Sequence, residues 1–341
     1  MATNQEIWLQ LTSEEPLEPD LPICDPHHHL WDRPESPDSP GSRYLLDDLV
    51  QDIGGGHNII KTVFIDCRAM YRADGPPEMK IVGETEFVQG IAAQSASGQY
   101  GPTRVAAGIV SHADLRLGTK VSEVLEAHLT ASPNRFRGIR HSSVWDENIQ
   151  RNYMNSPRGL LLDAKFREGF ECLQKYSLSF DAWLYFHQLP ELTDLAQSFP
   201  ETTIILDHIG GPLGVGPYAG QRSEVFRQWR KDIAKLSTCN NVYIKLGGMG
   251  MPIIGFGWSE LEAPPDSLEL AEAMSPYFNW CIEKFGVDRC MFESNFPVDK
   301  VSCSYTVMWN AFKRIVQDFS SSEKAALFYD TAQKAYRLKD N

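Results

Sequence analysis

Histidine residues give this 341-residue sequence its clearest chemical signal. Six of its nine histidines stand at the ends of short hydrophobic segments: His27, His28, His29, His141, His187 and His208. His27 and His29 are two residues apart, which places both imidazoles on one face of an extended strand and turns His28 the other way. Neutral imidazole is a common zinc ligand, and catalytic zinc typically has three protein ligands. The pattern predicts a metal site; the alternative is a set of histidines that only hydrogen-bond locally.

Two cationic residues, Arg140 and Lys245, also lie in the short hydrophobic segments. Arg140 precedes His141, so only one of the two can point into the interior of a strand layer. An arginine there could bind a substrate carboxylate through two parallel hydrogen bonds, or it could form a salt bridge at the rim. Lys245 lies within a strand-like segment, where it could contact substrate or form a buried, mainly structural pair with Glu293 on the next strand.

Two loops are rich in residues that could line a pocket. The loop 68–84 carries Arg68, Tyr71 and Arg72, and the loop 249–258 is apolar and rich in glycine. Solvent-exposed loops rarely hold so many apolar residues, and long loops on a rigid scaffold often carry binding residues. Arg68, Tyr71 and Arg72 are therefore candidate substrate-binding residues.

The elements that must position these residues alternate between strand and helix along the chain. Eight such pairs favour an α/β fold, a closed (β/α)8 TIM barrel, over an open sheet, and no GxGxxG or Walker motif follows a strand. In this architecture the chemistry lies at the carboxyl ends of the strands. Residues 1–20 are expected to form a surface arm, and residues 21–341 one barrel with a C-terminal helix near 321–337. The predicted strands are 22–26, 61–67, 104–111, 136–142, 179–187, 203–208, 242–247 and 289–295.

The composition limits the partners and the compartment. A net charge of −13 argues against nucleic acid and membrane as partners, but it permits a small anionic substrate held by local arginines. The seven cysteines are scattered without a CxxC pair, and the first 20 residues lack the features of a secretory signal. We expect a cytoplasmic protein with a small-molecule partner; a homo-oligomer is left open.

Six motifs in strand order resemble one family. They are DPHHHLWD (25–32), GIRH (138–141), FHQL (186–189), LDHIGGP (206–212), VYIKLGG (242–248) and FESNFPVD (292–299). The chain thereby resembles the amidohydrolase superfamily, in the amidohydrolase-related branch that includes lactonases acting on sugar lactones, muconolactones and pyrone dicarboxylate.

The resemblance implies roles for several residues. His27, His29 and His187 would hold one divalent metal ion, zinc or manganese, when one is present. His208 would orient or deprotonate water, and Arg140 would bind the substrate carboxylate. These roles make His208 and His187 candidate catalytic residues, together with Asn295, which occupies the position of the family's last-strand aspartate.

One position departs from the family pattern. Relatives usually have Ser-Asp-X-Pro after the last strand, where this chain has Ser294-Asn295-Phe296-Pro297. Asn295 cannot accept a proton at neutral pH and is a weaker metal ligand than aspartate. A metal-independent site is therefore an equal expectation. The base would then be His208 or a nearby carboxylate, for which Asp25, Glu84 and Asp299 are candidates.

The leading prediction is a hydrolase that opens a small, carboxylate-bearing lactone with water activated by histidine. One alternative is a non-oxidative decarboxylase of an aromatic acid. In relatives with that activity, strand 1 usually starts with glutamate and a more widely spaced histidine-proline pattern. The second is a non-catalytic barrel that binds a small molecule, which only Asn295 supports.

Overall fold

Eight parallel strands form the centre of the computed structural model, which describes residues 4–35, 42–149 and 156–339. Each strand pairs with the next in chain order. The strands are β1 (Ile23–His28), β4 (Ile59–Ile65), β5 (Arg104–Ser111), β6 (Phe136–Arg140), β7 (Ser179–Ala182), β8 (Ile204–Leu206), β9 (Val242–Leu246) and β10 (Cys290–Phe292).

The last strand returns to the first, so the sheet closes into a barrel. His28 forms a parallel bridge with Phe296, whose carbonyl accepts a hydrogen bond from the His29 amide at 2.8 Å. The Asn295 amide likewise donates to the carbonyl of His27 at 2.9 Å. The predicted (β/α)8 TIM barrel is confirmed, and its closure brings residues 27–29 next to residues 295–296.

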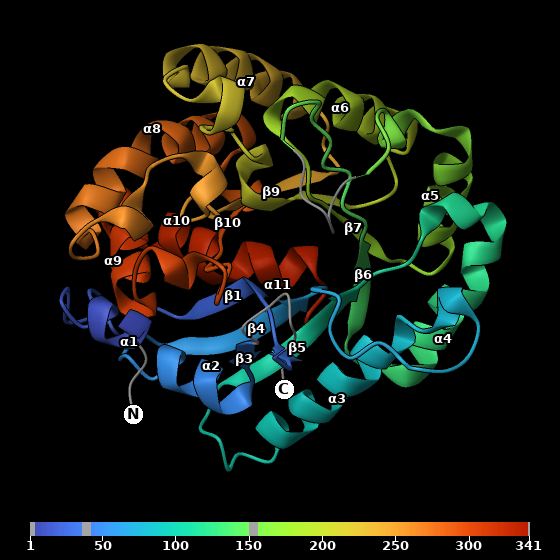
Figure 1. Ribbon diagram of the computed structural model, residues 1–341, viewed down its shortest axis with the longest axis horizontal. Coiled ribbons are helices and arrows are strands. Elements are labelled where there is room, and N and C mark those ends of the chain that lie inside the picture. Colours follow the sequence, from blue (N-terminus) through green and yellow to red (C-terminus); the bar gives the residue numbers. More distant parts are fainter. Residues whose placement is uncertain (1–3, 36–41, 150–155, 340–341) are drawn as a thin grey trace.

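Helices surround the strands on the outside (Figure 1). Helix α6 has Pro190 in its first turn and begins directly after the segment assigned to strand 7. The helices are α2 (Leu46–Ile53), α3 (Val82–Ala96), α4 (Val121–Ala131), α5 (Ala164–Lys175), α6 (Leu189–Ser198), α7 (Arg222–Leu236), α8 (Ser267–Phe285) and α9 (Tyr305–Ile315). None of the helices among the described residues is long and apolar enough to cross a membrane.

The N-terminal arm lies against the last helices of the barrel. It contains a short helix, α1 (Asn4–Leu9), and the Trp8 indole donates to the carbonyl of Leu261 at 3.0 Å. Further along the arm, the amide of Leu17 donates to the side chain of Asn310 in α9 at 2.7 Å.

The C-terminal residues 332–338 pack against side chains in the interior of the barrel. The predicted helix 321–337 consists of α10 (Ser321–Ala325), a π-helical turn (Ala326–Asp330) and α11 (Thr331–Ala335). Tyr336 is fully buried, and its hydroxyl donates to Asp181 on β7. This apolar packing forms a second hydrophobic cluster that includes Val63, Ile65, Val110, Ile205, Met291, Ala332, Ala335, Tyr336 and Leu338.

Candidate active site

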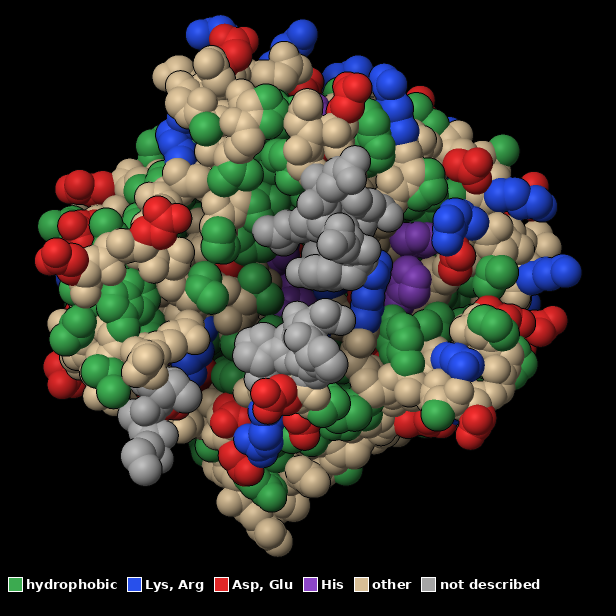
Figure 2. All heavy atoms as spheres, viewed as in Figure 1, with side chains coloured by type: hydrophobic (Ala, Val, Ile, Leu, Met, Phe, Trp, Pro, Cys, Tyr) green, Lys and Arg blue, Asp and Glu red, His purple; other side chains and the backbone are tan. Residues whose placement is uncertain are grey.

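A cavity of about 350 Å³ lies where the carboxyl ends of the strands meet. Six strands contribute polar residues, at the end of the strand or just after it: His29 (β1), Asp66 (β4), His112 (β5), Arg140 (β6), His208 (β8) and Asn295 (β10). Figure 2 shows histidine side chains near the centre of one face of the molecule, among hydrophobic and basic side chains. The remaining lining residues are Trp31, Arg33, Cys67, Arg68, Ser142, Trp183, Met251 and Val298.

Glu293 lies between two histidines beneath this cavity. Its Oε1 atom is 2.7 Å from Nδ1 of His208 and also accepts a hydrogen bond from the His208 amide at 3.0 Å. Its Oε2 atom is 2.7 Å from Nδ1 of His27. Burial favours the neutral acid, but His208 and His27 hold the pKa of Glu293 well below its usual range. The ionised carboxylate therefore favours a proton on Nδ1 of His208, which leaves Nε2 of His208 as a lone-pair donor.

His27 and His29 face each other through their Nε2 atoms. The two atoms are 3.3 Å apart, and Nδ1 of His29 lies 2.8 Å from the carbonyl of Ile65, which fixes a proton on Nδ1. Burial lowers the pKa of both imidazoles well below the usual value, so both are neutral. Two nitrogen ligands of a tetrahedral zinc ion lie about 3.3 Å apart, given Zn–N distances of about 2.05 Å. The pair therefore fits a divalent metal ion.

His208 is held in a backbone conformation that is unusual for a residue other than glycine. Its φ of 53° and ψ of 40° lie in the left-handed region. The side chain also packs edge-on against the Trp183 ring at a centroid distance of 4.8 Å. A side chain held by its backbone, by Glu293 and by Trp183 has little freedom to turn, as a positioned base requires.

Asn295 presents its carbonyl oxygen without a hydrogen-bond partner among the described residues. The side-chain amide donates to Oδ1 of Asp299 at 2.7 Å, and Oδ2 of Asp299 accepts a bond from the amide of Gly250 at 2.9 Å. The buried Oδ1 of Asn295 lacks a bond. Burial raises the pKa of Asp299 to about 7. Asp299 thus fixes the amide group of Asn295 and leaves the carbonyl oxygen of that side chain as an available acceptor.

Comparison with known proteins agrees with this geometry. The model of a family described as amidohydrolase matches residues 24–338. The chain belongs to the amidohydrolase family. An uncharacterised protein of Sinorhizobium fredii, y4mH, is 34% identical over 335 residues, covering 94% of this chain and 99% of the relative. An L-fucono-1,5-lactonase from Burkholderia multivorans is 25% identical over 321 residues, covering 93% and 96%.

A solved amidohydrolase shares the architecture. It is a Burkholderia multivorans amidohydrolase crystallised with bound zinc; the TM-score is 0.71 at 22% identity, and the match covers 93% of this chain and 99% of the other. The resemblance inferred from the motifs is thus confirmed, and the protein is a hydrolase of the amidohydrolase superfamily.

In this amidohydrolase the structure does not bring His187 to His27 and His29. Strand β7 ends at Ala182, and His187 lies in a short turn that leads into α6. Its Nε2 atom is 3.0 Å from Oδ2 of Asp146, and it does not line the cavity described above. The predicted three-histidine group therefore requires a correction, because the strand was expected to continue as far as His187.

Lys245 also differs from its predicted setting. Its ammonium is fully buried and donates to Asp181 at 2.8 Å and to Asp207 at 2.9 Å. The expected pair with Glu293 is wrong, because the register places Lys245 opposite Met291. The ammonium also lies 3.1 Å from Nδ1 of His27. A residue so enclosed does not line the cavity, which corrects its assignment to substrate binding.

The predicted arginines divide into two groups. Arg140 and Arg68 line the cavity, whereas Arg72 pairs with Glu86 on the exposed surface. Tyr71 lies behind the cavity wall, with its hydroxyl 3.4 Å from Asp66. The interpretation that only one of two neighbouring side chains points inward is confirmed for Arg140.

The three carboxylates considered as alternative bases do not line the cavity. Asp25 is buried and accepts hydrogen bonds from Ser294 and Tyr305, and Glu84 accepts the amides of Cys67 and Ala69. Neither these two carboxylates nor Asp299 is among the described residues that line the cavity.

Several lining residues were missed in the sequence. Trp31 and Arg33 follow the histidine triplet, and Trp183 follows β7. Their positions just after strands were the available signal, as they were for the histidines. Asp66 follows β4 in the same way, and Arg140 places its Nε 3.7 Å from Oδ2 of Asp66.

Proposed function

We propose that this amidohydrolase opens a small lactone that carries a carboxylate group, with His208 as the general base. The observation that carries the proposal is the contact of 2.7 Å between Nδ1 of His208 and Glu293. This contact fixes the tautomer in which Nε2 of His208 is unprotonated and can take a proton from water. Glu293 stabilises the imidazolium that forms, as an acidic partner does for a catalytic histidine.

The reaction follows from this arrangement. A water molecule gives a proton to Nε2 of His208 as its oxygen bonds to the lactone carbonyl carbon. The tetrahedral intermediate then expels the ring oxygen, which takes the proton back from His208. The ring C–O bond breaks, and the product is an open-chain hydroxy acid with no other reactant consumed. The carbonyl carbon of a lactone is electrophilic, so a single histidine base suffices to activate the attacking water.

Three arginines favour an anionic substrate. Arg33, Arg68 and Arg140 all line the cavity, and their guanidinium groups match the geometry of a carboxylate. Trp31 and Trp183 provide apolar walls against which a ring could pack. The relative named an L-fucono-1,5-lactonase makes sugar-acid lactones the first class to test.

A divalent metal ion is compatible with the site. We propose that Nε2 of His27 and Nε2 of His29 hold it and that Oδ1 of Asn295, which has no hydrogen-bond partner among the described residues, is a further ligand. A bound zinc or manganese ion supplies Lewis-acid polarisation of the carbonyl. The carbonyl of Ile65 holds His29 in the tautomer that a metal needs, and Glu293 lies 2.7 Å from Nδ1 of His27.

The test is a lactone panel assayed with the purified full-length protein. The panel contains L-fucono-1,5-lactone, a neutral lactone of the same ring size and a carboxylate-bearing lactone, and hydrolysis is measured by proton release. Released carbon dioxide is measured in parallel with an aromatic acid as substrate. Proton release without carbon dioxide supports the proposal. Carbon dioxide without lactone opening would establish the decarboxylase alternative, and neither activity would favour the non-catalytic barrel.

A further inference from the structure

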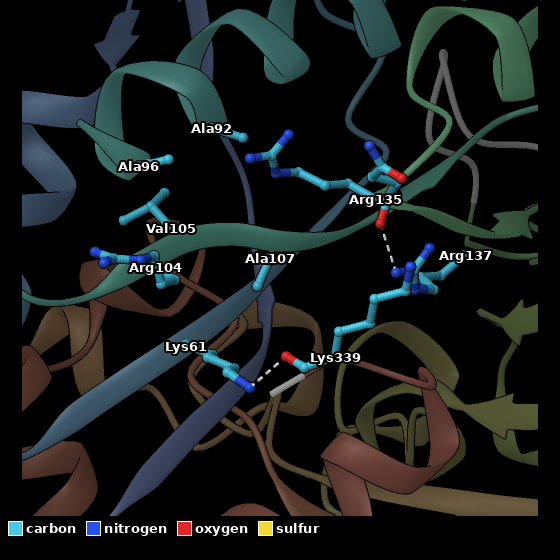
Figure 3. Close-up of a pocket in the computed structure, with 10 residues that line it drawn as sticks. Lys61, Ala92, Ala96, Arg104, Val105, Ala107, Arg135, Arg137 and Lys339 are labelled. Carbon is cyan, nitrogen blue, oxygen red and sulfur yellow. Dashed lines mark hydrogen bonds between the residues drawn. The ribbon is translucent and has the colours of Figure 1, made fainter. Parts of the chain in front are cut away.

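A second cavity lies at the opposite end of the barrel from the candidate active site. It has a volume of about 250 Å³ and lies at the amino ends of β4, β5 and β6, against the last turns of α3 (Figure 3). No aspartate or glutamate from the described ranges lines it, although the whole chain carries a net charge of −13. Its five basic lining residues are Lys61, Arg104, Arg135, Arg137 and Lys339.

Arg137 is the most enclosed of the three arginines. The residue is only 8% exposed, and its two terminal nitrogens donate to the carbonyls of Phe136 at 2.9 Å and Asn134 at 2.6 Å. Its Nε is buried and makes no hydrogen bond in the part of the chain that the structure describes. A buried donor that lacks an acceptor is costly, so such groups usually have a partner in the protein or in a ligand.

The positive charges in this region repel one another. Burial, together with Arg337 and Arg135, lowers the pKa of Arg137. Burial also lowers the pKa of Arg337, whose guanidinium donates to the carbonyl of Arg137. Among the described residues, none of Arg104, Arg135 and Arg137 forms an ion pair with a carboxylate. An anion in the cavity would relieve this repulsion.

Lys61 already has hydrogen-bond partners within the protein. Its ammonium donates to the side chain of Gln333 at 3.0 Å and to the carbonyl of Lys339 at 2.8 Å. The dashed line between Lys61 and Lys339 in Figure 3 marks the second of these bonds. Arg104 donates one bond to the carbonyl of Pro102 at 3.2 Å. The donors left for a ligand are Nε of Arg137, the guanidinium of Arg135 and the remaining N–H groups of Arg104.

We propose that this cavity binds a small, multiply charged oxyanion, for which inorganic phosphate is the probe. Guanidinium groups present parallel N–H donors that match phosphate oxygens, and charge-assisted bonds of this kind are stronger than neutral ones. The cavity volume is several times the roughly 30 Å³ that one water molecule occupies in the liquid, so it admits a tetrahedral ion. This site is independent of the lactone chemistry at the other end of the barrel.

The test is calorimetric titration of the full-length protein with inorganic phosphate at constant ionic strength. Arg137→Met removes the buried guanidinium. Arg135→Gln removes a partly exposed guanidinium, whose loss should destabilise the fold less. Arg227→Gln is the matched control, because Arg227 is an exposed arginine of α7 paired with Glu224. Arg140→Gln tests whether phosphate binds instead at the candidate active site.

The proposal predicts how each variant binds phosphate. Unaltered protein and the Arg227→Gln and Arg140→Gln variants bind phosphate alike, and Arg137→Met and Arg135→Gln each weaken binding at least about tenfold. Thermal unfolding reports whether Arg137→Met is folded, and Arg135→Gln decides the matter if it is not. Absence of phosphate binding, equal binding by Arg135→Gln, or loss confined to Arg140→Gln would each overturn the proposal.

Discussion

Nδ1 of His208 lies 2.7 Å from Oε1 of Glu293, and the same oxygen accepts the backbone amide of His208 at 3.0 Å. One carboxylate thus fixes both the ring and the backbone of the residue proposed as the base. Its other oxygen is 2.7 Å from His27, so Glu293 also orients a proposed metal ligand.

Replacing Glu293 with glutamine tests this orientation. A neutral amide keeps the shape but neither stabilises an imidazolium nor imposes one tautomer on His208. We expect kcat for lactone opening to fall by up to about 10⁴-fold, the scale seen when a comparable acidic partner is neutralised. Steady-state kinetics provide the measurement, with circular dichroism as the control for folding. A kcat within about threefold of the unaltered protein would contradict the assigned role.

Arg140→Gln tests the substrate carboxylate. The guanidinium lines the cavity, and its loss should weaken binding of an anionic substrate but not of a neutral one. We expect KM for a carboxylate-bearing lactone to rise about 10- to 100-fold, because a charge-assisted bond contributes about 1.5–3 kcal/mol. A neutral lactone of the same ring size is the internal control, and an equal rise in KM for both substrates would argue against carboxylate recognition.

Asn295→Asp tests whether this position limits metal binding. The buried Oδ1 of Asn295 has no hydrogen-bond partner among the described residues, and a carboxylate there would be a stronger ligand. We expect the variant to be purified with more zinc or manganese than the unaltered protein, measured by elemental analysis. His187→Asn should leave the metal content unchanged, because His187 is bonded to Asp146 away from the cavity. Unchanged metal in Asn295→Asp would refute the influence of this position.

Asp299 should make stability depend on pH. Burial raises its pKa to about 7, whereas an aspartate in an unfolded chain titrates near about 3.9. Between those values the folded state holds a proton that the unfolded state has lost, so the free energy of unfolding falls as pH rises, by about 1.4 kcal/mol per pH unit. Asp299→Asn removes this contribution.

The measurement is urea unfolding of both proteins at several pH values across that interval. We expect a shallower decline for Asp299→Asn than for the unaltered protein. Parallel declines would mean that Asp299 ionises normally in the folded state.

The strands could be predicted from the sequence because most carry consecutive apolar residues, as strands covered on both faces do. The ends of the strands could not be predicted in this way. Trp183, Leu184, Tyr185 and Phe186 continue the apolar run of β7 but pack in a loop, so the strand was extended to His187. The pattern of apolar residues indicates which residues are buried. Burial continues beyond the last residue that pairs with a neighbouring strand, so the pattern does not mark the end of the strand.

The candidate site was predictable in part for the same reason. His27, His29, Arg140, His208 and Asn295 come together because each stands at the end of a parallel strand. The partner of Glu293 was not predictable, because the choice between Lys245 and the histidines depends on the register of the closed barrel. That register joins residues far apart in the chain and leaves no local pattern.

Turnover of a lactone by the His208→Asn variant, compared with His187→Asn, tests the proposed mechanism most directly. Asparagine keeps a polar group in place but cannot take the proton from water. We expect His208→Asn to lose at least about 10³-fold in kcat with fold and metal content unchanged, while His187→Asn stays within about threefold of the unaltered protein. Comparable turnover by His208→Asn and the unaltered protein would contradict the assignment of His208 as the base.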